Sequence, residues 1–207
     1  MKKKIGIVNL KINNILSIYE ACVAAGYDVK IINKKTKVYN QNIIILPGIG
    51  SYKKAMEKLK KMNFEKKIKN FIKKKNNLLV GICLGMQLFF TKSEEFGETK
   101  GLNLIEGNVK KINKKNIVPH TGWNNILKNR KNSFLTTIKK KNMFYFTHSF
   151  YCDPLNKSFI IGKTKYKNFT FCSVVQKQNI IGMQFHPEKS SLLGIDLLKN
   201  LKNFKLK

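Results

Sequence analysis

The sequence predicts an α/β fold with a central, mostly parallel sheet and a strand-rich second half. In the first half, short apolar runs alternate with segments whose apolar residues recur at helical spacing. In the second half, β-branched and aromatic runs follow one another with turn residues between them. The 207 residues are enough to bury a sizeable core, and we expect a single domain over residues 1–207.

The elements of the first half follow from their apolar patterns. Residues 43–46 form a continuous apolar run, as expected for a strand that is buried on both faces of a parallel sheet. The segment from Ile15 to Gly26 predicts an amphipathic helix, with an apolar stripe made of Ile15, Leu16, Tyr19, Cys22 and Val23. The same reasoning predicts further strands at 5–8, 27–32 and 78–80, and further helices at 52–62, 64–72 and 88–90.

The second half is expected to contain strands and one final helix. The strands are predicted at 109–112, 142–146, 159–164, 171–175 and 180–185. The helix is predicted from the spacing of Leu193, Leu197, Leu201 and Phe204. No apolar run approaches the length of a membrane span, and the basic N-terminus precedes a short strand-like run rather than a signal-peptide core. We therefore expect a cytoplasmic protein.

The segment from Gly81 to Gln87 has the pattern of a nucleophile elbow. It follows an apolar run and places Cys83 on the turn between a strand and a helix. Gly81 and Gly85, two residues to either side, let neighbouring backbone pass close by. The positive end of a following helix favours the thiolate, so Cys83 is predicted to be the nucleophile.

A second chemical motif ends the predicted strand at 180–185. His186 offers a base, and Glu188 offers a carboxylate two positions further on. A thiol needs an imidazole to accept its proton, and the imidazole needs a third group to fix its tautomer. A buried cysteine and an unrelated loop histidine are the simpler interpretation of either residue alone, but their combination at two strand ends favours a Cys83–His186–Glu188 catalytic triad.

Three strand ends are predicted to converge at one edge of the sheet, where open α/β sheets bind their ligands. The third is the loop at 47–51, which contains two glycines. Backbone N–H groups of Ile49 or Gly50, together with that of Leu84, would make an oxyanion hole there. The simpler alternative for this loop is a plain Pro-Gly turn.

The composition is strongly basic. Lys and Arg number 41 against 11 Asp and Glu, which gives a formal net charge of +30. A high positive charge that is clustered on one surface binds nucleic acid. In this chain, however, Arg130 is the only arginine and the lysines are scattered along the sequence. We interpret the charge as a solvated lysine surface, with neither nucleic acid nor membrane as a partner, and keep a lysine-rich nucleic-acid binder as a competing hypothesis. The remaining cysteines, Cys22, Cys152 and Cys172, lack CxxC spacing and predict core packing rather than a disulfide framework or a zinc site.

The motifs resemble those of class I, triad-type glutamine amidotransferases. The elbow and the segment His186-Pro187-Glu188 are typical of the whole class. Three further segments, at 46–51, 120–124 and 144–149, are similar to the glutaminase subunits of imidazole glycerol phosphate synthase. The resemblance covers nearly the full length and implies a flavodoxin-like, three-layer amidotransferase fold without cofactor or metal.

The resemblance also implies roles for individual residues. Cys83 would attack the carboxamide carbon of glutamine, His186 would take the thiol proton and protonate the departing ammonia, and Glu188 would hold His186. The implied glutamine-binding positions are Gln87, Glu95, His148 and Ser149. The implied positions near the partner are Trp123, Asn124, Tyr145 and Lys189. For the side chain of His148 the simpler alternative is a structural histidine, and for Trp123 it is core packing.

The implied partner is a (β/α)8 cyclase subunit that forms a heterodimer with the glutaminase and receives its ammonia for histidine biosynthesis. The chain departs from the family at residues 9–14, where two glycines are missing and Asn13 can adopt the left-handed turn conformation. Thr121 and residues 171–173 also depart. One alternative is therefore a paralogue whose cyclase-like partner amidinates a surface-polysaccharide sugar, and another is a non-catalytic docking or regulatory subunit.

Overall fold

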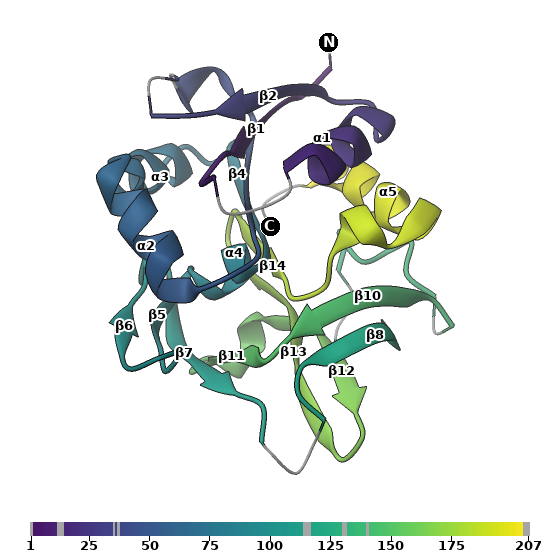
Figure 1. Cartoon of the computed structure of the whole chain (residues 1–207). Helices are drawn as coiled ribbons and strands as arrows, with labels where there is room; N and C mark the ends of the chain where they lie inside the picture. The colour runs from purple at the N-terminus through teal and green to yellow at the C-terminus, as the bar shows by residue number, and fades with distance from the viewer. Residues whose placement is uncertain are drawn as a thin grey trace.

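The computed structural model describes residues 2–11, 15–34, 36, 38–113, 117–129, 132–139 and 141–204, so the turn expected at Asn13 and the single Arg130 lie outside the described residues. The described chain forms one twelve-stranded sheet with helices on its faces and a separate two-stranded ribbon (Figure 1). The elements up to residue 100 are β1 (Lys4–Val8), α1 (Ile15–Ala24), β2 (Asp28–Ile32), η1 (Val38–Asn40), β3 (Ile43–Gly48), α2 (Tyr52–Lys61), α3 (Phe64–Ile72), β4 (Leu78–Cys83), α4 (Leu84–Gln87), β5 (Phe90–Ser93) and β6 (Thr99–Lys100). Those that follow are β7 (Ile105–Lys111), β8 (His120–Asn125), β9 (Leu127–Lys128), β10 (Met143–His148), β11 (Phe150–Pro154), η2 (Lys157–Phe159), β12 (Ile160–Tyr166), β13 (Phe169–Lys177), β14 (Ile180–Met183), η3 (Pro187–Lys189), α5 (Ser191–Lys199) and η4 (Asn200–Asn203).

The large sheet has a parallel half and a mostly antiparallel half. Its strand order is β2-β1-β3-β4-β14-β13-β11-β7-β5-β6, with β12 paired to β13 and β9. The strands from β2 to β14 in this order are parallel neighbours. β13 pairs antiparallel with β14, β11 and β12. The predicted α/β class with a strand-rich second half is confirmed.

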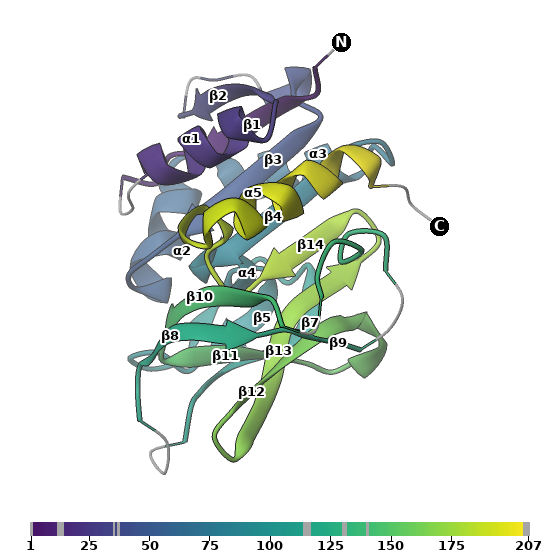
Figure 2. The same cartoon turned by 90° about the vertical axis from the view of Figure 1, so that its right-hand side faces the viewer.

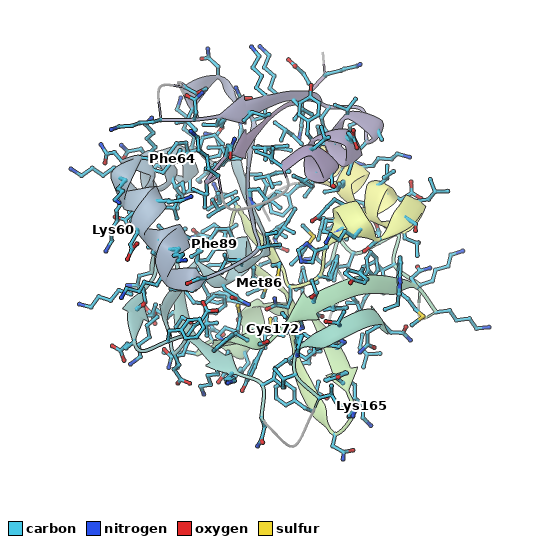
Figure 3. The ribbon with its side chains drawn as sticks, viewed as in Figure 1. Lys60, Phe64, Met86, Phe89, Lys165 and Cys172 are labelled. Atoms are coloured by element: carbon cyan, nitrogen blue, oxygen red, sulfur yellow. The ribbon has the colours of Figure 1, made fainter. Side chains whose placement is uncertain are left out.

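Helices cover both faces of the parallel half. α1 and α5 lie side by side on one face, and α2 and α3 lie on the other (Figures 1 and 2). Successive residues of a strand point to opposite faces, so in β3 Ile45 packs into the cluster on the α1–α5 side and Leu46 into the cluster on the α2–α3 side. Figure 3 shows Phe64, Met86 and Phe89, three members of the second cluster. The sheet is thus buried on both faces, which explains the continuous apolar runs.

The ribbon of β8 and β10 packs on the same side of the sheet as α5 (Figure 2). Its strands are antiparallel, with Tyr145 opposite Trp123. Phe144 and Phe146 are buried in the cluster that contains residues of α1 and α5. An isolated bridge joins Tyr145 to His186, so the ribbon reaches the segment that follows β14.

Some expectations about elements are wrong. The helix predicted at 88–90 does not form, because α4 ends at Gln87 and Phe90 begins β5. In α1, Leu16 and Val23 are exposed rather than part of the buried stripe, and Ile18 is buried instead. The final helix ends as α5 at Lys199 and continues as the 3-10 helix η4. None of the helices in the described ranges is long and apolar enough to cross a bilayer.

Candidate active site

Cys83 stands between β4 and α4 in an unusual backbone conformation, with φ 52° and ψ −109°. A positive φ strains an L-residue, and this kind of strain is found where a sharp turn presents a nucleophile. Gly85 permits the turn, because a Cβ there would lie 1.7 Å from the carbonyl oxygen of Leu46. At Gly81 a Cβ would lie 2.6 Å from Met86 N. The prediction that these two glycines allow close backbone approach is confirmed.

The helix after the elbow is shorter than the pattern predicts. α4 spans four residues, so few aligned peptide dipoles point at Cys83. The expectation that a following helix favours the thiolate therefore loses its basis.

His186 and Glu188 form a buried pair close to Cys83. His186 Nδ1 lies 2.7 Å from Glu188 Oε1, which assigns the Nδ1 proton to this bond and leaves Nε2 to accept another. Burial alone would lower the pKa of His186, but the neighbouring Cys83 side chain, followed by the Glu188 carboxylate, outweighs burial and raises the pKa above its ordinary value of 6.5. Nε2 is buried and has no aligned hydrogen bond within the described ranges. Catalytic hydrogen bonds often tighten only when substrate is bound.

The backbone of β10 and the Ser190 hydroxyl hold the His186 segment in place through three hydrogen bonds. His186 N donates to Tyr145 O at 2.9 Å. Tyr145 N donates to Ser190 Oγ at 3.0 Å, and Ser190 Oγ donates to His186 O at 2.6 Å. Ser190 is fully buried. The ribbon and the His186 segment are therefore fixed to each other.

Two glutamines connect Cys83 to the backbone of β11. Gln184 Nε2 donates to Cys83 Sγ at 3.6 Å. Gln87 Nε2 donates to Phe150 O at 3.1 Å and to Gln184 Oε1 at 3.4 Å. On another side, Cys83 Sγ donates to Thr147 O at 3.9 Å. The sequence analysis did not select Gln184 as a site residue. The one sequence feature that indicates a role for Gln184 is its position two residues before His186, at the end of the same strand.

His148 and His120 form a pair of neutral, buried rings. His148 Nδ1 donates to Phe150 O at 2.8 Å, and His120 Nδ1 donates to His148 Nε2 at 3.1 Å. Asn124 Nδ2 lies 3.4 Å from His120 Nε2 and completes the chain. Burial lowers the pKa of His120 to about 4 and that of His148 to about 3. With both ring nitrogens bonded, His148 matches the structural interpretation of its side chain.

A cavity of about 970 Å³ opens at Cys83. Gly48 pairs in register with Cys83 across β3 and β4, so the loop that follows it starts beside the nucleophile. Side chains of both charge signs line the cavity, which suits a small zwitterion such as an amino acid. The predicted oxyanion-hole and glutamine-binding residues that line it are Ile49, Gly50, Leu84, Gln87, Glu95, His148 and Ser149.

Glu95 has a structural contact as well as a place in the cavity. Its Oε2 accepts a hydrogen bond from Tyr52 N at 2.5 Å. Tyr52 is the first residue of α2, so the carboxylate satisfies a backbone donor at a helix start. Glu95 therefore joins the start of α2 to the cavity wall.

The predicted interface residues fall into two groups. Trp123 and Tyr145 meet edge to face with ring centroids 6.0 Å apart, and Lys189 Nζ lies 5.7 Å from the Tyr145 centroid. Trp123 is 47% exposed, so the core-packing alternative for it is wrong. Asn124, the next residue along β8, is directed elsewhere, since its amide donates to Lys165 O at 3.0 Å. Lys165 lies toward the end of the β12–β13 hairpin (Figure 3).

A strained cysteine at a strand-to-helix turn, a buried His–Glu pair and an adjoining cavity fit the pattern predicted for a triad-type cysteine enzyme of the α/β class. The chain belongs to the glutamine amidotransferase class-I family, whose model matches residues 7–202. The catalytic chemistry predicted from the sequence is that of this family.

Known relatives are similar over nearly the whole chain. The chain is 40% identical over 196 residues to the imidazole glycerol phosphate synthase subunit HisH of Caldanaerobacter subterraneus subsp. tengcongensis, covering 95% of this chain and 96% of the relative. It is 34% identical over 192 residues to the protein of the same name from Chlorobaculum tepidum, covering 92% and 95%.

Solved structures with low sequence identity share the fold. PurLQS from Thermotoga maritima matches with a TM-score of 0.76 and 17% identity over 98% of this chain and 99% of the other. A glutamine amidotransferase from Thermotoga maritima matches with a TM-score of 0.66 and 13% identity over 91% of this chain and 77% of the other. These likenesses confirm the predicted amidotransferase-like fold.

Proposed function

We propose that this protein is the glutaminase subunit of an imidazole glycerol phosphate synthase. It hydrolyses glutamine to glutamate and ammonia and delivers the ammonia to a cyclase subunit for histidine biosynthesis. The observation that carries the proposal is the buried His186–Glu188 pair next to Cys83, at a cavity lined by side chains of both charge signs. The names of the relatives support the pathway rather than sugar amidination.

The triad divides the hydrolysis into two steps. In the first, His186 Nε2 takes the thiol proton, and the sulfur of Cys83 bonds to the carboxamide carbon of glutamine. The imidazolium, stabilised by Glu188, then gives its proton to the leaving nitrogen. The C–N bond breaks, ammonia departs, and a glutamyl thioester remains. In the second step His186 deprotonates water, which adds to the thioester and releases glutamate and the free thiol.

Backbone donors at the cavity floor stabilise the negative oxygen that forms in both steps. We assign this role to the N–H group of Leu84 with that of Ile49 or Gly50. A donor of this kind contributes about 3 to 4 kcal/mol to transition-state stabilisation in other enzymes. Gln87 and Glu95 hold the amino-acid end of the substrate, and the backbone at His148 and Ser149 meets its carboxylate.

The ammonia has to travel to its acceptor without passing through bulk water, where it would be protonated and lose its nucleophilicity. We assign the partner to the (β/α)8 type and its docking face to Trp123, Tyr145 and Lys189, with Asn124 behind them. Exposed aromatic residues are common anchors in protein interfaces. The heterodimer would thus dock on the ribbon whose backbone also holds His186.

The test is glutamate release from glutamine, measured with and without the cyclase subunit encoded in the same genome. We expect low release alone, a strong increase in the complex, and a loss of activity in Cys83→Ala. Cys22→Ala, a buried cysteine in α1, serves as the matched control and retains activity. Glutamine hydrolysis that survives Cys83→Ala would overturn the proposal.

A further inference from the structure

Gln184 occupies a fully buried position between the nucleophile and the cavity wall. It follows β14, and its backbone N donates to Ser173 O at 2.9 Å, which continues the strand pairing one residue further. Its side chain lies between Cys83 Sγ and the amide of Gln87. A buried amide in this position is costly unless its polar atoms are bonded.

The orientation of this amide follows from the chemistry of its neighbours. Phe150 O can only accept a hydrogen bond, so the atom of Gln87 that faces it, at 3.1 Å, has to be nitrogen. The same nitrogen lies 3.4 Å from Gln184, so the Gln184 atom that faces it has to be oxygen. The remaining amide atom of Gln184, which lies 3.6 Å from Cys83 Sγ, is therefore the nitrogen. Gln184 presents a donor to the sulfur.

The sulfur has a different partner for each protonation state. The protonated thiol donates to Thr147 O at 3.9 Å. The thiolate accepts from Gln184 Nε2, and a hydrogen bond to the charged form favours that form. With a four-residue helix behind it, Cys83 depends on such side-chain donors.

We propose that Gln184 is a positioning residue whose amide, oriented by Gln87, holds the Cys83 sulfur and stabilises its thiolate. Gln184 acts through Cys83 and does not contact the reacting carboxamide. The inference rests on the proposed glutaminase chemistry, because it assigns a supporting hydrogen-bond donor to Cys83, the proposed nucleophile. Its consequence is a Cys83 sulfur that reacts more readily with an electrophile than it would without this donor.

The experiment measures the rate at which iodoacetamide alkylates Cys83 as a function of pH, followed by mass spectrometry of the Cys83 peptide. Gln184→Met keeps the length of the side chain and removes the amide. We expect the midpoint of its alkylation profile to move up by about one pH unit, as one hydrogen bond to a charged group implies. Gln41→Met is the matched control, since Gln41 is also buried but packs near Gly6, away from the site.

A second variant keeps the proposal testable if Gln184→Met does not fold. Gln87→Met leaves Gln184 in place but frees its amide, so we expect a smaller shift in the same direction. Midpoints of Gln184→Met and Gln87→Met that equal those of wild type and Gln41→Met would overturn the proposal. Glutamate release by the wild-type complex tests the proposed function separately, because alkylation of a thiol needs neither glutamine nor a partner.

Discussion

At the scale of single residues, the elbow depends on the absence of side chains at its glycines. Cys83 is held at a positive φ, and Gly85 packs its backbone directly on the carbonyl of Leu46. The sequence predicts this arrangement because glycines two residues before and two residues after Cys83 are the pattern of a nucleophile elbow. Nothing in the pattern reveals the hydrogen bond from Gln184, because that contact depends on how β14 and β4 are placed side by side.

Gly85→Ala is expected to destabilise the fold severely. A Cβ at this position would lie 1.7 Å from Leu46 O, and a backbone atom in β3 cannot move aside as a flexible side chain can. We expect a loss of about 3 kcal/mol or more in the free energy of unfolding, measured by denaturant titration. Gly97→Ala is the control: its φ is +94° but open space surrounds it, so the cost is about 1–2 kcal/mol of backbone strain. Equal losses for the two variants would contradict the packing argument.

Glu188→Gln is expected to impair catalysis while the fold persists. The carboxylate accepts the Nδ1 proton of His186 and raises the pKa of that imidazole. An amide removes this charge, so the pKa of His186 should fall in an NMR titration. The turnover number for glutamate release in the complex should decrease about 10²- to 10⁴-fold, as when a buried triad carboxylate becomes an amide elsewhere. The exposed Glu98→Gln, which loses only an ion pair with Lys92, should match wild type.

At the scale of elements, the ribbon of β8 and β10 matters because its backbone fixes the catalytic base. Neither β8 nor this fixation is predictable from apolar patterns, since β8 consists mainly of exposed and half-buried residues. The parallel strands are predictable because burial on both faces produces continuous apolar runs. The prediction of a helix at 88–90 is wrong because a short apolar run does not distinguish a helix from a strand. The buried residues Leu88, Phe89 and Phe90 fit the start of a strand as well as a helix.

Ser190→Ala tests the link between the ribbon and the base. The substitution removes the hydroxyl that accepts from Tyr145 N and donates to His186 O. We expect a loss of about 1–3 kcal/mol in unfolding free energy, since two buried backbone groups lose a partner. We also expect a decrease in turnover number that exceeds any change in KM. Ser173→Ala is the control, because the Ser173 hydroxyl is buried without a hydrogen-bond partner in the described chain. If Ser190→Ala and Ser173→Ala change stability and turnover number equally, the link between the ribbon and the base is refuted.

At the scale of the whole molecule, the neutral histidine pair couples folding to pH. Burial lowers the pKa of His120 to about 4 and that of His148 to about 3, whereas an unfolded histidine titrates near 6.5. Between these values the unfolded chain binds more protons than the folded chain, so stability rises with pH there and is lost as pH falls. His186, whose pKa is raised, contributes a smaller slope of the opposite sign near pH 6.5, because the folded chain already holds that proton while the unfolded histidine is only partly protonated.

We therefore expect the free energy of unfolding to fall by about 2 kcal/mol between pH 7 and pH 5, after allowance for the opposing contribution of His186. Urea titrations at closely spaced pH values would measure it. The double variant His120→Asn, His148→Gln should lose most of this pH dependence. A wild-type stability that stays constant from pH 7 to pH 5 would rule out a neutral buried pair.

The triad is tested most directly by treating the protein, in complex with its cyclase partner, with a diazoketone analogue of glutamine and mapping the adduct. The Cys83–His186–Glu188 arrangement predicts one adduct, on Cys83, that excess glutamine prevents and that is absent from Cys83→Ser. No adduct, or an adduct on Cys22, Cys152 or Cys172, would contradict the assignment of Cys83 as the nucleophile.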